Sequence, residues 1–139
     1  MATKDLVIGS SLLVTYNIKD QDGREFGHFS FSPSDTDIVK RHKKVVSELE
    51  KIEIPENEDM ADALERIDEL IYKEVDYLLG ANVSESFFSI MGPFSPLENG
   101  QFFIEAVLDA IGQAIQNETG KRVEKIAGKI NKHTSKYHG

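Results

Sequence analysis

The spacing of apolar residues changes near residue 31, and this change limits the folds available to the chain. Before that point, four apolar residues alternate with more polar neighbours, as in a strand with one buried face: Leu12, Val14, Tyr16 and Ile18. Beyond it, apolar residues recur every three or four positions, as in amphipathic helices. We therefore predict an α+β fold, with an N-terminal β-hairpin over residues 12–31 followed by a mostly α-helical domain of four to five helices from about residue 35.

The hairpin is predicted to contain an irregularity in its second strand. Turn-forming residues at positions 20–23, Asp-Gln-Asp-Gly, separate the two extended runs. Phe26 does not share the parity of Phe29 and Phe31, so the three side chains reach one face of the sheet only if an extra residue lies between them. Gly27 is the residue best able to accommodate such a β-bulge.

The rest of the chain is expected to form helices that are separated by proline and glycine. Ser34 is the expected N-cap of the first helix, Gly80 ends the second, and Gly120 separates the last two. These helices belong to a single domain over residues 1–130, and residues 131–139 are expected to form a disordered basic tail. The expected helices cover about residues 35–52, 60–79, 84–91, 102–115 and 121–130.

Charge is divided unevenly along the chain. Residues 1–120 carry 10 Lys/Arg and 23 Asp/Glu, whereas residues 121–139 carry 6 and 1, so an acidic body is followed by a basic end. An acidic body repels phosphate groups, and we expect no nucleic-acid partner even though residues 40–44 read Lys-Arg-His-Lys-Lys. Helical spacing places those cations on the flanks and outer face of an amphipathic helix, which we interpret as a solvated face.

No motif in the chain predicts catalysis. There is no cysteine, and the four histidines lack the spacing of a zinc site. The signatures of serine hydrolases, nucleotide-binding loops and zinc proteases are absent. We predict a protein that is not an enzyme and that uses neither a metal nor a cofactor. No apolar run is long enough to span a membrane, so we expect a cytoplasmic protein without a membrane partner.

Two groups of residues are candidates for binding another protein. The first gathers apolar side chains in a segment broken by Gly and Pro: Phe87, Phe88, Met91, Phe94 and Leu97. The alternative for this group is burial in the core, which is the commoner place for such side chains. The second group lies on the basic last helix, where it is free to meet the carboxylates of the helix expected over residues 60–79 or those of a neighbouring subunit: Lys125, Lys129 and Lys132. A homo-oligomer is also expected, because a lone hairpin exposes edges that a second copy can pair with.

Five segments carry a resemblance to a known family. In chain order they are FSFSPSDTDIVKRHKKVVSELEKI, IDELIYKEVDYLLG, SESFFSIMGPFS, FFIEAVLDAIGQAI and RVEKIAGKINKHTSKY. Together with the hairpin that precedes them, they resemble the tail assembly chaperones encoded by long-tailed phages and prophages of Gram-positive bacteria. The resemblance rests on the order and character of these segments and spans nearly the whole chain.

The resemblance implies a protein of the host cytoplasm that binds the phage tape measure protein and keeps it soluble while tail tube subunits assemble around it. The tail tube protein is a second candidate partner. A long helical client with apolar faces suits a chaperone that offers apolar grooves within a highly charged body. Two other functions stay open, namely a small nucleic-acid-binding regulatory protein that uses the basic residues and a minor structural tail completion protein.

Overall fold

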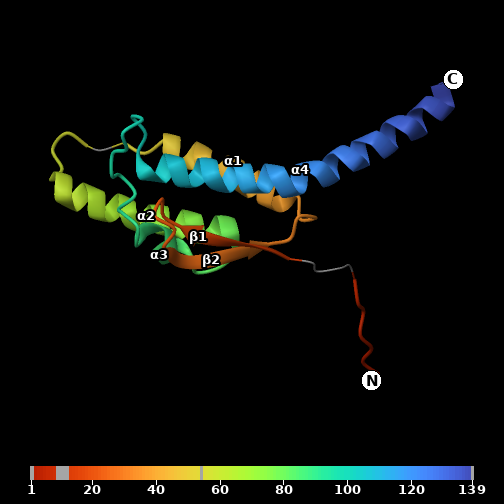
Figure 1. Cartoon of the computed structure of the whole chain (residues 1–139), viewed down its shortest axis with the longest axis horizontal. Coiled ribbons are helices and arrows are strands. Elements are labelled where there is room, and N and C mark those ends of the chain that lie inside the picture. The colour runs from red at the N-terminus through yellow and green to blue at the C-terminus, as the bar shows by residue number, and fades with distance from the viewer. Residues whose placement is uncertain (1, 9–12, 54, 139) are drawn as a thin grey trace.

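The computed structural model describes residues 2–8, 13–53 and 55–138, with side chains up to Gly120. In this part of the chain a two-stranded antiparallel sheet is followed by four helices, which confirms the predicted α+β fold (Figure 1). The elements are β1 (Val14–Lys19), β2 (Glu25–Phe31), α1 (Asp37–Glu50), α2 (Met60–Leu79), α3 (Ser84–Phe88) and α4 (Phe103–His138).

The β-bulge lies where the sequence predicts it. The pairing of β1 with β2 skips Phe26, which falls between the partners of Ile18 and Lys19. Gly27 has a φ of +143°, a value that residues with a side chain rarely adopt. A Cβ atom at this position would also lie 2.8 Å from the Cβ of Ser86 in α3. Both the bulge and the close approach of α3 therefore require glycine at position 27.

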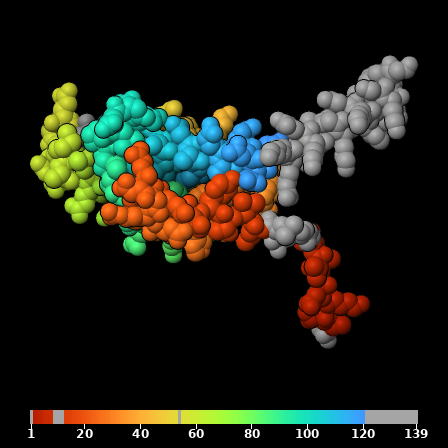
Figure 2. Space-filling model, viewed as in Figure 1, coloured from red at the N-terminus to blue at the C-terminus, as the bar shows by residue number. Residues whose placement is uncertain are grey.

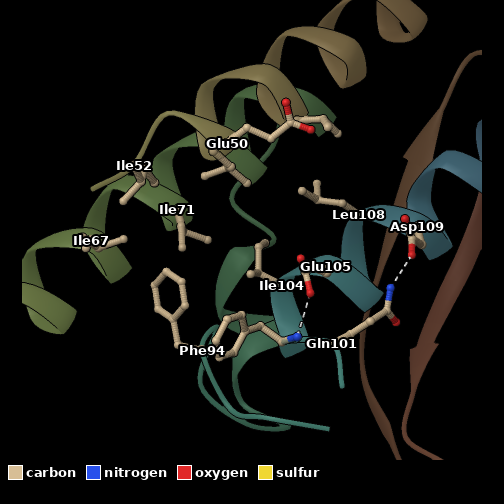
Figure 3. A pocket seen from close by; sticks show the side chains of 13 residues that line it. Glu50, Ile52, Ile67, Ile71, Phe94, Gln101, Ile104, Glu105, Leu108 and Asp109 are labelled. Carbon is tan, nitrogen blue, oxygen red and sulfur yellow. Dashed lines mark hydrogen bonds between the residues drawn. The ribbon is translucent and has the colours of Figure 1, made fainter. Parts of the chain in front are cut away.

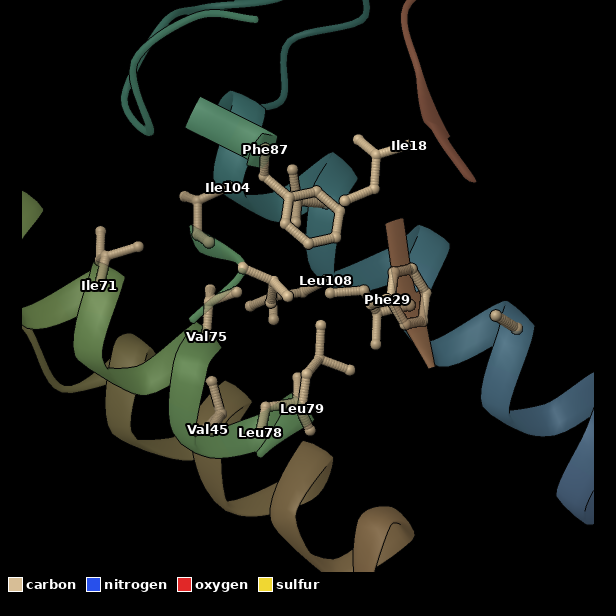
Figure 4. Close-up of a cluster of buried hydrophobic side chains, with 14 of the residues drawn as sticks. Ile18, Phe29, Val45, Ile71, Val75, Leu78, Leu79, Phe87, Ile104 and Leu108 are labelled. Atoms are coloured by element: carbon tan, nitrogen blue, oxygen red, sulfur yellow. The ribbon is translucent and has the colours of Figure 1, made fainter. Parts of the chain in front are cut away.

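Helix α2 forms the centre of the core. Its fully buried side chains recur at intervals of three and four residues: Ala63, Ile67, Ile71, Val75 and Leu78. Asp59 caps the start of the helix by accepting a hydrogen bond from the backbone N–H of Asp62, and Gly80 ends it with a φ of 67°. Figure 4 shows side chains from α1, α3, α4 and the hairpin gathered around this stripe. The predicted helix and its end at Gly80 are confirmed.

The other elements surround α2 on two sides. Helix α1 packs on both α2 and α4, while the hairpin and α3 lie together along the other side of the helices (Figure 1). The ring of His42 in α1 is hydrogen-bonded to the carbonyl oxygen of Leu108 in α4 at 2.9 Å. A Cβ atom at Gly112 would lie 2.9 Å from this ring, so a glycine in α4 permits the approach of α1.

Helix α4 differs from the sequence-based expectation. It is one continuous helix to His138, so the predicted break at Gly120 is wrong. A glycine inside a helix costs only about 1 kcal/mol relative to alanine, and good helix-forming residues precede and follow this one. The backbone of residues 131–138 continues the same helix, where a separate disordered tail was expected.

Two helix ends also differ by a few residues. Helix α1 begins at Asp37 with Thr36 as its N-cap, two residues after the cap expected at Ser34, and the carboxylate of Asp35 accepts a hydrogen bond from the backbone N–H of Asp37 at 3.0 Å. Helix α3 ends at Phe88, earlier than the predicted residue 91, and the chain passes through a turn before the Gly-Pro loop.

Candidate functional site

An apolar groove opens where the end of α1, the first half of α2 and the start of α4 converge (Figure 3). Its volume is about 440 Å³, which lies within the range of small-ligand and peptide pockets. We call it the helical groove. It is lined by Val46, Leu49, Glu50, Ile52, Ile67, Ile71, Phe94, Gln101, Phe102, Ile104, Glu105, Leu108 and Asp109.

The helical groove has a buried floor and a partly open mouth. Ile67 and Ile71 of α2 form the floor and have no exposed surface. Leu49 and Ile52, at the end of α1, are half-buried and form one wall. Phe102 lies on the opposite wall with 45% of its surface exposed. Large apolar side chains that remain this accessible are available to a partner without unfolding of the core.

The aromatic wall of the groove is held by the start of α4. The rings of Phe94 and Phe102 meet edge to face with their centroids 5.6 Å apart. The backbone N–H groups of the first two residues of α4 donate to the carbonyl oxygens of Ser95 and Pro93, at 2.9 and 2.8 Å. The first turn of a helix leaves its N–H groups without helical partners, so these bonds tie the loop firmly to the helix. Figure 3 shows Phe94 directed toward the α2 floor.

Three carboxylates surround the apolar lining. Glu105 accepts a hydrogen bond from the backbone N–H of Phe102 at 2.8 Å, and Asp109 accepts one from the side chain of Gln101 at 2.9 Å, so both are fixed in position (Figure 3). Glu50 is exposed, and its carboxylate makes no hydrogen bond or ion pair with another residue whose side chain the structure describes. The lining contains no basic residue, which gives the mouth of the groove a negative potential.

The chemistry of the helical groove is that of a binding surface. Apolar walls with an acidic rim favour an amphipathic helix whose apolar face is flanked by Lys or Arg.

Across the described ranges, no three His, Asp or Glu side chains come together in a way that could hold a metal ion. No helix within those ranges combines the length and the apolar character needed to cross a bilayer.

The aromatic segment predicted as a client surface is divided by the fold. Phe87 and Phe88 are buried in the core, as the alternative interpretation of this segment expects. Met91 is exposed and Leu97 half-buried, but neither lines the helical groove. Phe94 alone contributes to it. The five residues therefore do not form one surface, because α3 packs the first two into the core and only one of the three that follow α3 reaches the groove.

The sequence-based interpretation missed the walls of the groove. Phe102 falls within the helix expected over residues 102–115, but it precedes the first residue of α4, and its ring packs on that of Phe94. Leu49 and Ile52 fall within the helix expected over residues 35–52, and both pack against the core while they remain half-buried. The available signal was an apolar residue directly at a helix start, outside the run of positions that share one face.

The basic cluster at residues 40–44 is engaged with its own chain. The guanidinium of Arg41 donates to the carbonyl oxygen of Leu78 at 3.1 Å and pairs with Asp35 at 3.6 Å. The ammonium of Lys44 lies 5.3 Å from the centre of the Tyr77 ring. These contacts favour a structural role over phosphate binding. The side chains of Lys125, Lys129 and Lys132 lie outside the described residues, so their assignment stays a prediction.

Asp76 has a structural role that the sequence did not reveal. Its carboxylate accepts hydrogen bonds from the backbone N–H groups of Val83 and Ser84, at 2.9 and 2.8 Å, and from the Ser84 hydroxyl at 3.1 Å. These bonds join the end of α2 to the start of α3. One of the carboxylates on the outside of α2 therefore serves the turn between two helices.

Comparison of the chain with protein-family models, with curated proteins and with solved structures finds no match. The functional argument therefore rests on the residues and geometry of the chain itself.

Proposed function

We propose that this protein is a tail assembly chaperone of a long-tailed phage or prophage, which holds helical segments of the tape measure protein in solution and performs no catalysis. The observation that carries the proposal is the acid-rimmed helical groove, whose exposed aromatic wall suits the apolar face of a client helix. The resemblance of the chain's segments to that family supports the same assignment.

The groove favours a particular kind of client segment. A helix presents apolar side chains at i, i+3, i+4 and i+7, and such a stripe fits a trough that is walled by three helices. Basic residues beside the stripe would meet Glu50, Glu105 and Asp109 at the rim. Pairs of this kind contribute modestly, about 0.2–1 kcal/mol each when exposed, so the apolar contacts supply most of the affinity.

The proposal is tested by co-expressing the chain with a helical fragment of a tape measure protein and measuring how much fragment remains soluble. Phe102→Gln removes the exposed aromatic wall, so the soluble fraction should fall close to the level without chaperone. Leu70→Gln is a matched control, because Leu70 is 42% exposed on α2 and lines none of the described grooves. It should leave the soluble fraction unchanged.

Two results would contradict the proposal. One is that the wild-type chain does not raise the soluble fraction of the tape measure fragment, or that the Phe102→Gln and Leu70→Gln variants raise it equally. The other is tight binding of DNA or RNA at physiological salt with a steep salt dependence, lost when Lys125, Lys129 and Lys132 are all changed to Gln. That second result would favour the nucleic-acid-binding alternative.

A further inference from the structure

The helical groove continues between α1 and α4 into a second hollow. This hollow has a volume of about 660 Å³ and shares Asp109 with the helical groove. Its walls include Val39 and His42 in the first half of α1, and Gly112 and Gln116 in the middle of α4. We call the hollow and the helical groove together the trough.

The trough follows one face of each of its two long walls. On α1 its lining residues recur every three or four positions, and those on α4 do the same, so each set shares one helix face: Val39, His42, Val46 and Leu49, and Glu105, Asp109, Gly112 and Gln116. Figure 2 shows the first half of α4, from cyan to blue, at the surface of the body. Val39 and Phe102, at the two ends of the trough, are 47% and 45% exposed. The trough is therefore one elongated surface with accessible apolar side chains at both ends.

The second half of α4 has the chemistry that this surface favours. Residues 121–139 carry 6 Lys/Arg and 1 Asp/Glu. Helical spacing places three aliphatic residues on one face and a row of lysines to one side of them: Val123, Ile126 and Ile130, and Lys125, Lys129, Lys132 and Lys136. Lysines four positions apart on a helix repel one another, and carboxylates of a partner relieve that repulsion.

The charge of the trough is opposite to that of this segment. Glu50, Glu105 and Asp109 line it, and none of its described lining side chains is Lys or Arg. The basic half of α4 is thus an amphipathic helix with cations beside its apolar face, as the acidic rim of the helical groove requires.

The continuity of α4 decides which copy supplies the segment. α4 is a single helix of 36 residues, in which residues 103–120 border the trough and residues 121–138 form the basic half. A continuous helix cannot lie alongside itself, so the basic half of one molecule reaches only the trough of another. The two halves have equal length, about 27 Å each at 1.5 Å per residue.

An antiparallel pair of α4 helices satisfies both copies at once. When the basic half of each helix lies against the first half of the other, the two-fold axis passes close to Gly120. Residues 129–136 then come level with the stretch from Glu105 to Gly112, which carries two of the three acidic groups. Gly120 has no side chain to separate the helices where they cross. This arrangement gives a reason for a glycine inside α4.

We propose that two copies of the chain form a symmetric dimer in which the basic half of each α4 occupies the trough of the other copy. The dimer covers Phe102 and the exposed lining of the helical groove. A client helix then enters the groove by displacing the basic half of the partner's α4, and this last step alone rests on the function proposed above.

Cross-linking tests the contact directly, because the chain contains no cysteine of its own. Gln116 is exposed in the trough, and the antiparallel arrangement brings Ala127 of the other copy within about two residues of its level. Molecules carrying only Gln116→Cys are mixed with molecules carrying only Ala127→Cys and treated with a short bifunctional maleimide. A product with the mass of two chains is expected on mixing. Each variant alone should give little, since like positions lie more than two helical turns apart along the axis.

Two outcomes of the cross-linking would overturn the proposal. One is the absence of a product on mixing. The other is an internal cross-link in a chain that carries both cysteines, without any product on mixing, because it would mean that the basic half docks in its own chain.

Sedimentation of the full-length chain over a wide concentration range supplies the second measurement. Ile126→Ser combined with Ile130→Ser should raise the dimer dissociation constant by about tenfold or more, because both side chains belong to the face that enters the trough. Asn131→Ser, on another face of the same segment, is the matched control and should change it much less. A monomer at every concentration, or equal effects of the two variants, would contradict the proposal.

A charge exchange tests the antiparallel arrangement, in which Lys132 of one copy is level with Asp109 of the other. Asp109→Lys alone and Lys132→Glu alone should each raise the dissociation constant about threefold to tenfold at low salt, since each change opposes like charges. A chain with both changes should recover the wild-type value. A simple disturbance of the fold would give no recovery, and the absence of recovery would contradict the arrangement.

The co-expression assay separates this inference from the proposed function. The Ile126→Ser, Ile130→Ser chain should keep more of the tape measure fragment soluble than the wild type at equal concentration, because its helical groove is uncovered. An unchanged soluble fraction would refute displacement by the client. If a dimer forms but no form of the chain solubilises the fragment, the proposed function fails and the dimer stands. If a chain that stays monomeric solubilises the fragment, the dimer fails and the function stands.

Discussion

Phe87 and Phe102 lie on the two sides of one loop and have different surroundings. Phe87 is 7% exposed and its ring lies 5.9 Å from that of Phe29, where α3, the sheet and α4 enclose it. Phe102 packs edge to face on Phe94 at the mouth of the helical groove, and nearly half of its surface is accessible. The same residue type thus serves stability in one place and is available for binding in the other. The difference arises from how many elements close over each ring.

The largest effect on stability is expected at Phe87, whose ring is enclosed. Phe87→Ala should lower the free energy of unfolding by roughly 3–5 kcal/mol, since it leaves a cavity among packed rings. Urea denaturation followed by circular dichroism measures this loss. A loss below about 1 kcal/mol would mean that the ring is not enclosed as described, and the contrast with Phe102 would no longer hold.

Gly27, at the β-bulge beside α3, should be the next most sensitive position to substitution. Gly27→Ala should cost about 1–3 kcal/mol, because it combines an unfavourable φ with a clash against Ser86. Adding Ser86→Gly removes the clashing atoms and should recover part of the stability, while the backbone strain stays. The measurement is the midpoint of urea unfolding for Gly27→Ala alone and for Gly27→Ala combined with Ser86→Gly. Full recovery of the lost stability would show that the positive φ contributes little to the cost. No recovery would show that the clash with Ser86 contributes little.

At the accessible ring, Phe102→Gln should change the free energy of unfolding by less than about 1 kcal/mol. The side chain already contacts water, so its replacement leaves no enclosed cavity. Leu70→Gln provides the matched measurement on an exposed residue outside the groove. If Phe102→Gln costs as much as Phe87→Ala, the helical groove belongs to the core and is not an open surface.

The smallest effect concerns how the stability of the fold depends on pH through two partly buried tyrosines, Tyr16 and Tyr72. Burial raises the pKa of the Tyr16 hydroxyl, and the hydrogen bond that it donates to Glu118 at 2.9 Å and the charge of that carboxylate raise it further. Burial raises the pKa of Tyr72 as well, with smaller contributions from Asp68 and Glu85. The stabilising contribution of each neutral hydroxyl is complete below the unfolded pKa of about 10 and is lost as the pH rises through the folded pKa.

Tyr16→Phe should therefore flatten the fall in stability above about pH 10 relative to the wild type, although it lowers stability at neutral pH by removing the bond to Glu118. The measurement is the thermal midpoint at several pH values on both sides of the tyrosine pKa. An alkaline slope equal to that of the wild type would show that the raised pKa of Tyr16 does not contribute to stability.

Much of the fold follows from local patterns, whereas the groove depends on distant segments. The alternation around Tyr16, the shifted parity of Phe26 and the stripe ending at Gly80 were each readable from a few neighbouring residues. The helical groove combines Ile52 with Phe102, which are far apart in the sequence and whose proximity depends on how α1 and α4 pack. The helix break expected at Gly120 is absent for a related reason, since the helical cost of a glycine, about 1 kcal/mol, is small enough for its surroundings to decide the outcome.

The bond between Tyr16 and Glu118 also bears on the synthesis of the chain. It joins residues that are 102 positions apart, so this contact of the two-stranded sheet can form only after α4 has been made as far as Glu118. At translation rates of roughly 5–20 residues per second, the aromatic face of the hairpin waits about 5–20 seconds for the helix that completes its enclosure. During that interval the nascent hairpin exposes the stacked rings of Tyr16, Phe29 and Phe31, together with the free edge of β1. The ribosome-bound chain is then most open to mispairing with its neighbours on the same messenger RNA.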